Sequence, residues 1–336
     1  MPLHSIGDLA QQFVLRGQAV SLTREMNRLT QEVSTGQAAD LARHLSGHFA
    51  PLADIDRALV LTEAQSGAAR LAATDAALMQ TALERVQTEA QRLAETALSV
   101  PAGGGSTLPS LLALEARGAL SSMIGALNVD AAGRALFSGD RSDAAPLASA
   151  ETLLTGLRAA LAGAPDRAAI ETALDAFFDA PGGGFEAAVY RGGTGSAAGV
   201  SLGAGETVAL RIRADDVALR SQIKSTAMAA LVDDESLSLS SADRRAMSGA
   251  LGERLLAGQD GVIGLRARLG SAEARIAEAA SRIAAEKTGL AIARNDLVSV
   301  DIFASATALE GVQFQLEALY TITARTARLN LAAFLS

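Results

Sequence analysis

Apolar side chains near the start of the chain recur at intervals of three and four residues. The positions are Leu15, Ala19, Leu22, Met26, Leu29 and Val33. This repeat places them on one helix face and is the seam of a two-stranded coiled coil. Gly36 follows directly, and glycine commonly ends a helix in a left-handed conformation. The pattern predicts a first helical arm over residues 1–35.

A matching pattern occupies the end of the chain. Its apolar and small positions are Ile302, Ser305, Leu309, Val312, Leu316, Leu319 and Thr323, followed by Leu331, Phe334 and Leu335 on an apolar last turn. These spacings predict a final helix, which Ser299 or Asp301 can cap. A chain end is normally frayed and polar, so an apolar helical end needs a partner. The first arm offers one, although periodicity alone also allows two ordinary bundle helices.

Between the arms, the pattern predicts helices running out, a small mixed region, and helices running back. Long helical faces cover about 52–100 and 262–295, and a helix over 111–128 follows the glycine-rich turn 101–109. Two short helices are expected in the middle of the chain, over 148–162 and 167–178. After them, alternation at Val208, Leu210 and Ile212 between glycine clusters is typical of short strands.

The expected fold class is therefore mainly α: a long antiparallel helical bundle or coiled coil formed by both chain ends, with a small inserted α+β domain. The expected division has an N-terminal arm and helical hairpin at 1–140, an inserted outer domain at 141–220, and returning helices with the C-terminal arm at 221–336. Aromatic residues make up only 3% of the chain and Trp is absent. Such a composition suits long helices with thin seams better than one thick core.

Charge and composition exclude several classes of function. The net charge is -8, and Lys224 and Lys287 are the only lysines, so a nucleic-acid footprint is not expected. The chain has no cysteine, which excludes disulfides and thiolate chemistry. No apolar run is long enough to insert into a membrane, and the start lacks the pattern of a cleaved signal peptide.

Candidate chemistry is sparse. His44 and His48 lie four residues apart, but a zinc protease motif needs Glu at the place of Leu45. The glycine-rich stretches 103–105, 182–184 and 203–205 lack the Lys-Ser/Thr context of phosphate loops and are expected to be turns. We expect no catalytic residues, no cofactor and no metal, and hence no enzyme.

The C-terminal end of the chain carries a dense set of characteristic positions: Ala306, Leu309, Gln313, Gln315, Leu316, Glu317, Ala318, Tyr320, Thr323, Ala324, Arg325, Arg328, Leu329, Leu331, Phe334 and Leu335. By these positions the C-terminal arm resembles the bacterial flagellin superfamily, in particular its hook-associated members at the hook–filament junction. The segment 128–139, NVDAAGRALFSG, is similar to one that closes the N-terminal helical part of junction proteins. Residues 32–37, EVSTGQ, also match, but the AADLARHLSGHF that follows departs from the family's polar S-P-S-D-D-P loop.

The resemblance implies a structural subunit that joins hook to filament, exported through the flagellar type III apparatus to an extracellular location. It implies arms that order against neighbouring subunits, self-assembly into a ring or helical lattice, contacts with a neighbouring hook-associated protein and flagellin, and an export chaperone. The expected assembly interface comprises Leu15, Leu22, Met26, Leu29, Val33, Ile302, Leu309, Val312, Leu316, Leu319, Leu331, Phe334 and Leu335. The alternatives are the filament flagellin itself and, from another class, a soluble coiled-coil scaffold or signalling protein.

Overall fold

A computed structural model describes residues 6–102, 108–203 and 205–335, with side chains described for 10–101, 108–203 and 205–326. The chain forms two compact units. The arm unit comprises Met1–Glu63 and Ala285–Ser336, and the body unit comprises Ala64–Ala284. These boundaries fall inside two long helices, whereas the division expected from the sequence lay at residues 140 and 220.

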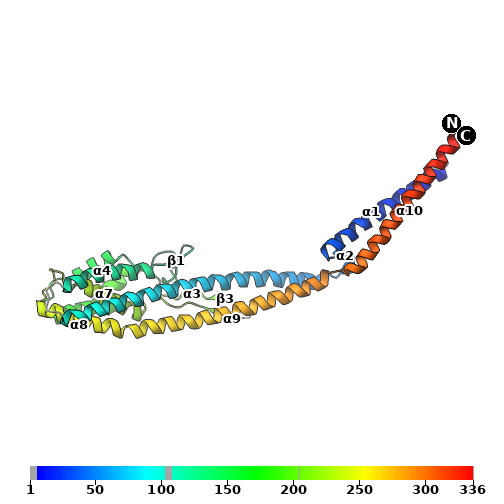
Figure 1. Cartoon of the computed structure of the whole chain (residues 1–336). Coiled ribbons are helices and arrows are strands. Elements are labelled where there is room, and N and C mark those ends of the chain that lie inside the picture. Colours follow the sequence, from blue (N-terminus) through cyan, green and yellow to red (C-terminus); the bar gives the residue numbers. More distant parts are fainter. Residues whose placement is uncertain (1–5, 103–107, 204, 336) are drawn as a thin grey trace. The chain divides into compact units, whose positions relative to one another are not determined.

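Helices dominate both units, which confirms the mainly α class (Figure 1). The α-helices are α1 (Ile6–Thr35), α2 (Leu41–His44), α3 (Ala50–Ala102), α4 (Leu108–Leu127), α5 (Ala150–Leu161), α6 (Arg167–Asp179), α7 (Val217–Leu231), α8 (Ser241–Ala257), α9 (Gln259–Val298) and α10 (Ile302–Leu335). A π-helical turn, η1, covers Phe185–Val189.

Four short strands form two antiparallel hairpins among the described residues. They are β1 (Asp130–Ala131), β2 (Arg134–Ala135), β3 (Val200–Ser201) and β4 (Thr207–Val208). In the first hairpin Asp130 pairs with Ala135, and in the second Val200 pairs with Val208. The alternation at Val208, Leu210 and Ile212 predicted short strands, and of these three positions only Val208 lies in one. After Val208 the chain leaves the hairpin, and the N–H of Ala214 donates to the carbonyl of Phe137 at 2.9 Å.

One continuous core holds the body unit together. The apolar face of α3, including Leu83, Val86 and Leu93, is fully buried, as are Leu120 on α4 and Leu265 on α9. Small residues at the intervening α3 positions, mostly alanines, are buried with them. Helices α5, α6 and α7 contribute to the same core, so the inserted region has no separate core of its own.

The segment 128–139 connects the helical hairpin of the body unit to the inserted region. Asn128 uses both ends of its amide, donating to the carbonyl of Leu147 and accepting from its N–H, each at 2.9 Å. Gly139 has φ +65, and a Cβ there would lie 2.4 Å from the carbonyl oxygen of Gly195. A glycine is required because both the left-handed backbone and the close approach exclude a side chain.

Candidate assembly surface

The two chain ends pack against each other as an arm pair, α1 with α10, running in opposite directions (Figure 1). At their seam Leu29 is only 3% exposed, and Leu316 and Leu319 are also buried. Partly buried seam positions are Leu15, Leu22, Met26, Val33, Leu309 and Val312. Most of the arm positions named from the sequence therefore lie where one chain packs its own two ends together, and their role in contacts between subunits stays a prediction.

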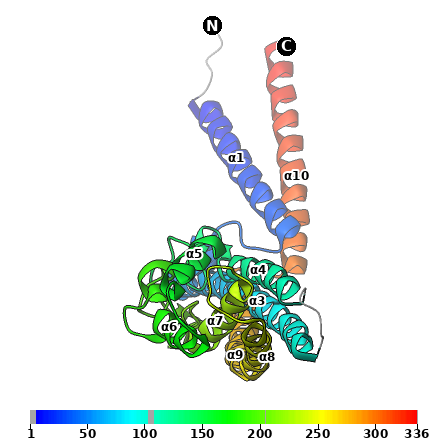
Figure 2. The same ribbon diagram turned by 90° about the vertical axis from the view of Figure 1, so that its left-hand side faces the viewer.

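Ile302 is the described residue of the predicted interface that lies apart from this seam. Ile302 is 52% exposed, and its side chain lies beside Gly36 at the base of the arm pair. Leu331, Phe334 and Leu335 lie outside the residues whose side chains are described. The seam is also less covered toward the start of α1, where residues 10–14 are all exposed. Figure 2 shows the two helices separating toward their free ends.

The base of the arm pair is fixed by backbone hydrogen bonds between its two linkers. Gly36 adopts φ +69 and its N–H donates to Glu32 at 2.8 Å, which confirms the predicted left-handed helix end. The N–H of Ala38 then donates to the carbonyl of Val298, and the N–H of Val300 to that of Gly36. Asp301 caps α10 by accepting from two backbone N–H groups.

A charged network strengthens the same end of α1. Arg28 donates to both oxygens of Glu25, at 2.5 and 3.1 Å, and to buried Glu32 at 2.6 Å. Glu32 also accepts the N–H of Ala39, so its carboxylate ties the linker to the helix. The hydrogen bond from Arg28 lowers the pKa of Glu25 despite some burial of the carboxylate. These charges hold the arm and its linker together.

A second set of apolar residues on the arm pair faces away from the seam. Phe13 on α1 is 80% exposed, and Phe303 and Phe314 on α10 are 85% and 72% exposed. Val20 on α1 is exposed as well. Two large aromatics on the outer face of one helix are unusual where nothing covers them, and such patches mark interaction sites. Sequence reasoning missed them because it followed the stronger stripe on each helix.

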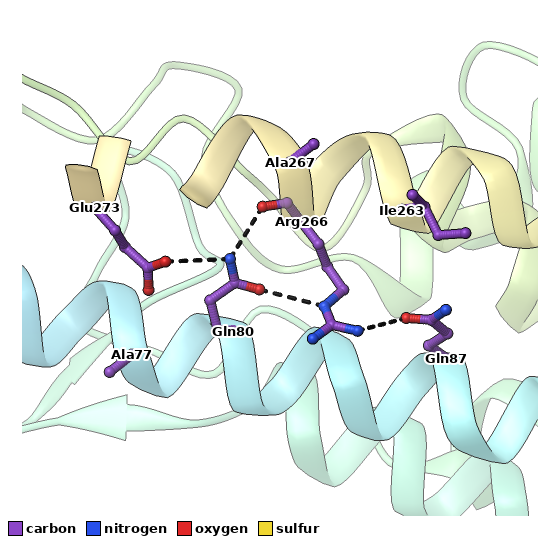
Figure 3. A pocket seen from close by; sticks show the side chains of 7 residues that line it. All are labelled: Ala77, Gln80, Gln87, Ile263, Arg266, Ala267 and Glu273. Atoms are coloured by element: carbon purple, nitrogen blue, oxygen red, sulfur yellow. Dashed lines mark hydrogen bonds between the residues drawn. The ribbon is translucent and has the colours of Figure 1, made fainter. Parts of the chain in front are cut away.

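The polar hollow between α3 and α9 in the body unit is a helix-to-helix contact. It is an open hollow of about 600 Å³, and Figure 3 shows its polar side chains directed at one another. Arg266 donates to Gln80 at 3.3 Å and to Gln87 at 2.7 Å, while the Gln80 amide donates to the Arg266 carbonyl at 3.0 Å. These bonds occupy the polar groups that a ligand would need. We therefore interpret the hollow as a polar contact that fixes the register of α3 against α9.

Candidate catalytic and metal groups do not converge in the described part of the chain. His44 is the last residue of the short helix α2, His48 follows it, and both are exposed. No group of three or more His, Cys, Asp or Glu among the described residues could hold a metal ion.

Gly182 and Gly203 adopt positive φ in turns, as predicted for their stretches, while 103–105 lies outside the described residues. No described helix is long and apolar enough to cross a bilayer.

Comparison with known proteins matches the last two helices of the chain and, separately, the fold. Residues 260–335, which cover nearly all of α9 and α10, match the family described as the bacterial flagellin C-terminal helical region. A solved structure described as a flagellar hook-associated protein from Vibrio parahaemolyticus matches with a TM-score of 0.52 and 14% sequence identity. The match covers 73% of this chain and 95% of that one. No curated protein sequence matches the chain.

Proposed function

We propose that this chain, which belongs to the flagellin superfamily, is the subunit that joins the hook of the bacterial flagellum to its filament. The family assignment makes it an exported structural protein of the flagellum. The assignment to the junction draws on the fold shared with a hook-associated protein and on the segment 128–139. The arm pair carries the proposal, because its aromatic outer face lies open in the single chain.

The arm pair would be the assembly element. Its seam positions, from Leu15 to Val33 and from Leu309 to Leu319, hold the two chain ends together in one subunit. Neighbouring subunits would then cover the outer aromatics and the apolar turn at 331–335. The prediction that the arms order only on assembly now concerns chiefly their free ends, since the base of the pair is fixed within the chain.

Export would precede assembly. We infer passage through the flagellar type III apparatus in an unfolded state, with a chaperone shielding the apolar arms beforehand. A chain without cysteine needs no oxidative step at its destination. Once outside, the subunit would contact a second hook-associated protein on one side and flagellin on the other.

Location and truncation test this function. Gold-labelled antibody against the chain should decorate the hook–filament junction. Removing the last ten residues, 327–336, should leave a soluble chain that is still exported but does not join the structure. Normal filaments grown on the truncated chain would show that the arm is not the assembly element.

Charge placed in the seam provides a second test. Leu316→Asp with Leu319→Asp should abolish incorporation, because it buries unpaired carboxylates between α1 and α10. The matched control is Leu71→Asp with Leu114→Asp, which makes the same chemical change at two exposed leucines of the body unit. The control should assemble normally. Equal loss in both variants would show that the effect is not specific to the arm.

The alternatives differ in measurable ways. A filament flagellin would be decorated along the whole filament, whereas a junction protein occupies one narrow band. A soluble coiled-coil scaffold should resist protease at both ends in dilute solution. The junction assignment predicts clipping that starts at the free ends of the arms, where residues 10–14 are exposed, and proceeds to a core near residues 50–290 once the arm pair opens.

A further inference from the structure

We propose that neighbouring copies of this chain dock side by side, with the outer face of α1 on one copy against the outer face of α10 on the next. The inference rests on the proposed function and names the contact by which it would operate. Three pairs define the docking: Arg24 with Glu310, Val20 with Phe314, and Arg16 with Glu317.

On the α1 side of this contact, a basic, an apolar and a second basic side chain follow one another along the helix. Arg16, Val20 and Arg24 follow one another at intervals of four residues, so they lie on successive turns of one helix side. All three are exposed, on the side away from the seam residues Leu22 and Leu29. Neither arginine has an ion-pair partner among the residues whose side chains are described, in contrast to the fully engaged Arg28.

On the α10 side, an acidic, an apolar and a second acidic side chain follow one another along the helix. Glu310, Phe314 and Glu317 are spaced by four and three residues and are all exposed, opposite the seam residues Leu316 and Leu319. Neither carboxylate pairs with a cation in the described part of the chain. Arg325 is the remaining charge on that side of the described helix, and it lies eight residues beyond Glu317, outside the triplet.

The two triplets match in spacing when the helices run antiparallel. Arg16 and Arg24 are about 12 Å apart along α1, and Glu310 and Glu317 are about 10.5 Å apart along α10. Measured from the base of the arm pair, each α1 residue lies about 5 Å farther out than its α10 counterpart. A single axial shift between copies therefore brings all three pairs together, with an apolar contact between two ion pairs.

The position of the faces makes the contact heterologous. The outer face of α1 and the outer face of α10 lie on opposite sides of the arm pair (Figure 2). One copy can therefore bind a neighbour on each side, which builds a ring or an open lattice rather than a closed pair. Charge complementarity at such a contact sets partner choice and register more than raw affinity.

Charge reversal tests the pairing through mixing. Chains with Arg16→Glu and Arg24→Glu, or with Glu310→Arg and Glu317→Arg, should each lose incorporation into flagella about tenfold or more, because like charges then face each other. Produced together, the two chains should recover, since each offers the other a complementary face. The control, Arg191→Glu with Arg211→Glu, changes net charge like the first variant at exposed body-unit positions and should assemble normally. Normal incorporation of either reversed chain alone, or no recovery on mixing, would overturn the pairing.

Disulfide trapping tests the contact directly, because the natural chain contains no cysteine. Full-length chain with Val20→Cys and Phe314→Cys should form a ladder of linked multimers in oxidised flagella, since the two positions cannot meet within one copy. Either single variant should stop at dimers or monomers. If antibody still places the chain at the junction but no ladder forms, the pairing is wrong and the proposed function stands. If the chain is absent from the junction, the proposed function itself fails.

Discussion

The pairing of α1 with α10 in a single chain can be tested by emptying the centre of their seam. Leu29 is 3% exposed and is the most deeply buried of the arm residues named from the sequence. Replacing it with Ala removes buried carbon and leaves a cavity. Measured costs of such changes run from about 2 to 5 kcal/mol. We expect about 2–3 kcal/mol here, because a two-helix seam can partly close around the missing atoms.

Hydrogen exchange of the purified full-length chain, read by mass spectrometry, measures this cost locally. Since about 1.4 kcal/mol corresponds to a tenfold change in an opening equilibrium, exchange of the core amides should accelerate about 30- to 150-fold. The acceleration should appear in both α1 and α10, although only α1 is changed. Peptides from α4 in the body unit should exchange at unchanged rates.

Val14→Ala is the matched control, since Val14 lies on the same helix but is more than half exposed. It should change stability by no more than about 0.5 kcal/mol. Faster exchange in α1 with unchanged exchange in α10, in the Leu29→Ala chain, would refute the pairing of the two helices. Unprotected exchange of both helices in the unaltered chain would equally show that the ends do not pair before assembly.

Three further predictions concern the body unit. Gly139→Ala should lower the thermal unfolding midpoint, because a Cβ at φ +65 meets the carbonyl of Gly195. Gly118 lies on α4 with open space around it, so Gly118→Ala should instead stabilise the protein by up to about 1 kcal/mol. Arg282 and Arg275 on α9 donate hydrogen bonds to Glu206, which lies between β3 and β4, and these bonds lower the pKa of its carboxyl group. They should hold the β3–β4 hairpin to α9 above pH 4.5 and be lost as the pH falls through the lowered pKa. Proteolysis of the 200–208 hairpin should then rise at acid pH, and in Glu206→Gln at neutral pH. Arg266→Leu should cost about 1 kcal/mol in chemical denaturation, by leaving two part-buried glutamine oxygens unpaired.

The sequence was informative where a local rule decided the structure. Helix α3 was expected over about 52–100 and spans Ala50–Ala102, because its apolar repeat is long and unbroken. Gly36 was expected to end the first helix in a left-handed conformation, and it does. Of the two candidate caps for the last helix, Asp301 supplies the carboxylate, while the N–H of Ser299 still bonds to Asn295 within the preceding helix.

Features that depend on several distant segments could not be predicted. In the sequence, nothing distinguishes Gln80, Gln87 and Arg266 from ordinary solvated residues. Their hydrogen bonds form because α3 and α9 meet at one register. The alternation at Val208, Leu210 and Ile212 continues beyond the strand, which ends at Val208, and the hydrogen bond from Ala214 to Phe137 joins segments too distant for the local pattern to reveal. Phe303 and Phe314 were visible in the sequence. Their outward direction became clear only once the seam had assigned the opposite face of α10 to α1.

The outer face of the arm pair favours the proposed assembly arm over an ordinary helical scaffold. A solvated two-helix scaffold needs only one apolar stripe on each helix, since its outer face meets water. Here Phe13, Phe303 and Phe314 are more than 70% exposed, and the charges beside them, at Arg16, Arg24, Glu310 and Glu317, lack ion-pair partners in the described chain. Such exposure brings a risk of nonspecific association, which a stand-alone scaffold has no reason to carry. The seam therefore pairs the two helices within one chain, and the open outer face is the surface that we propose a neighbouring subunit covers.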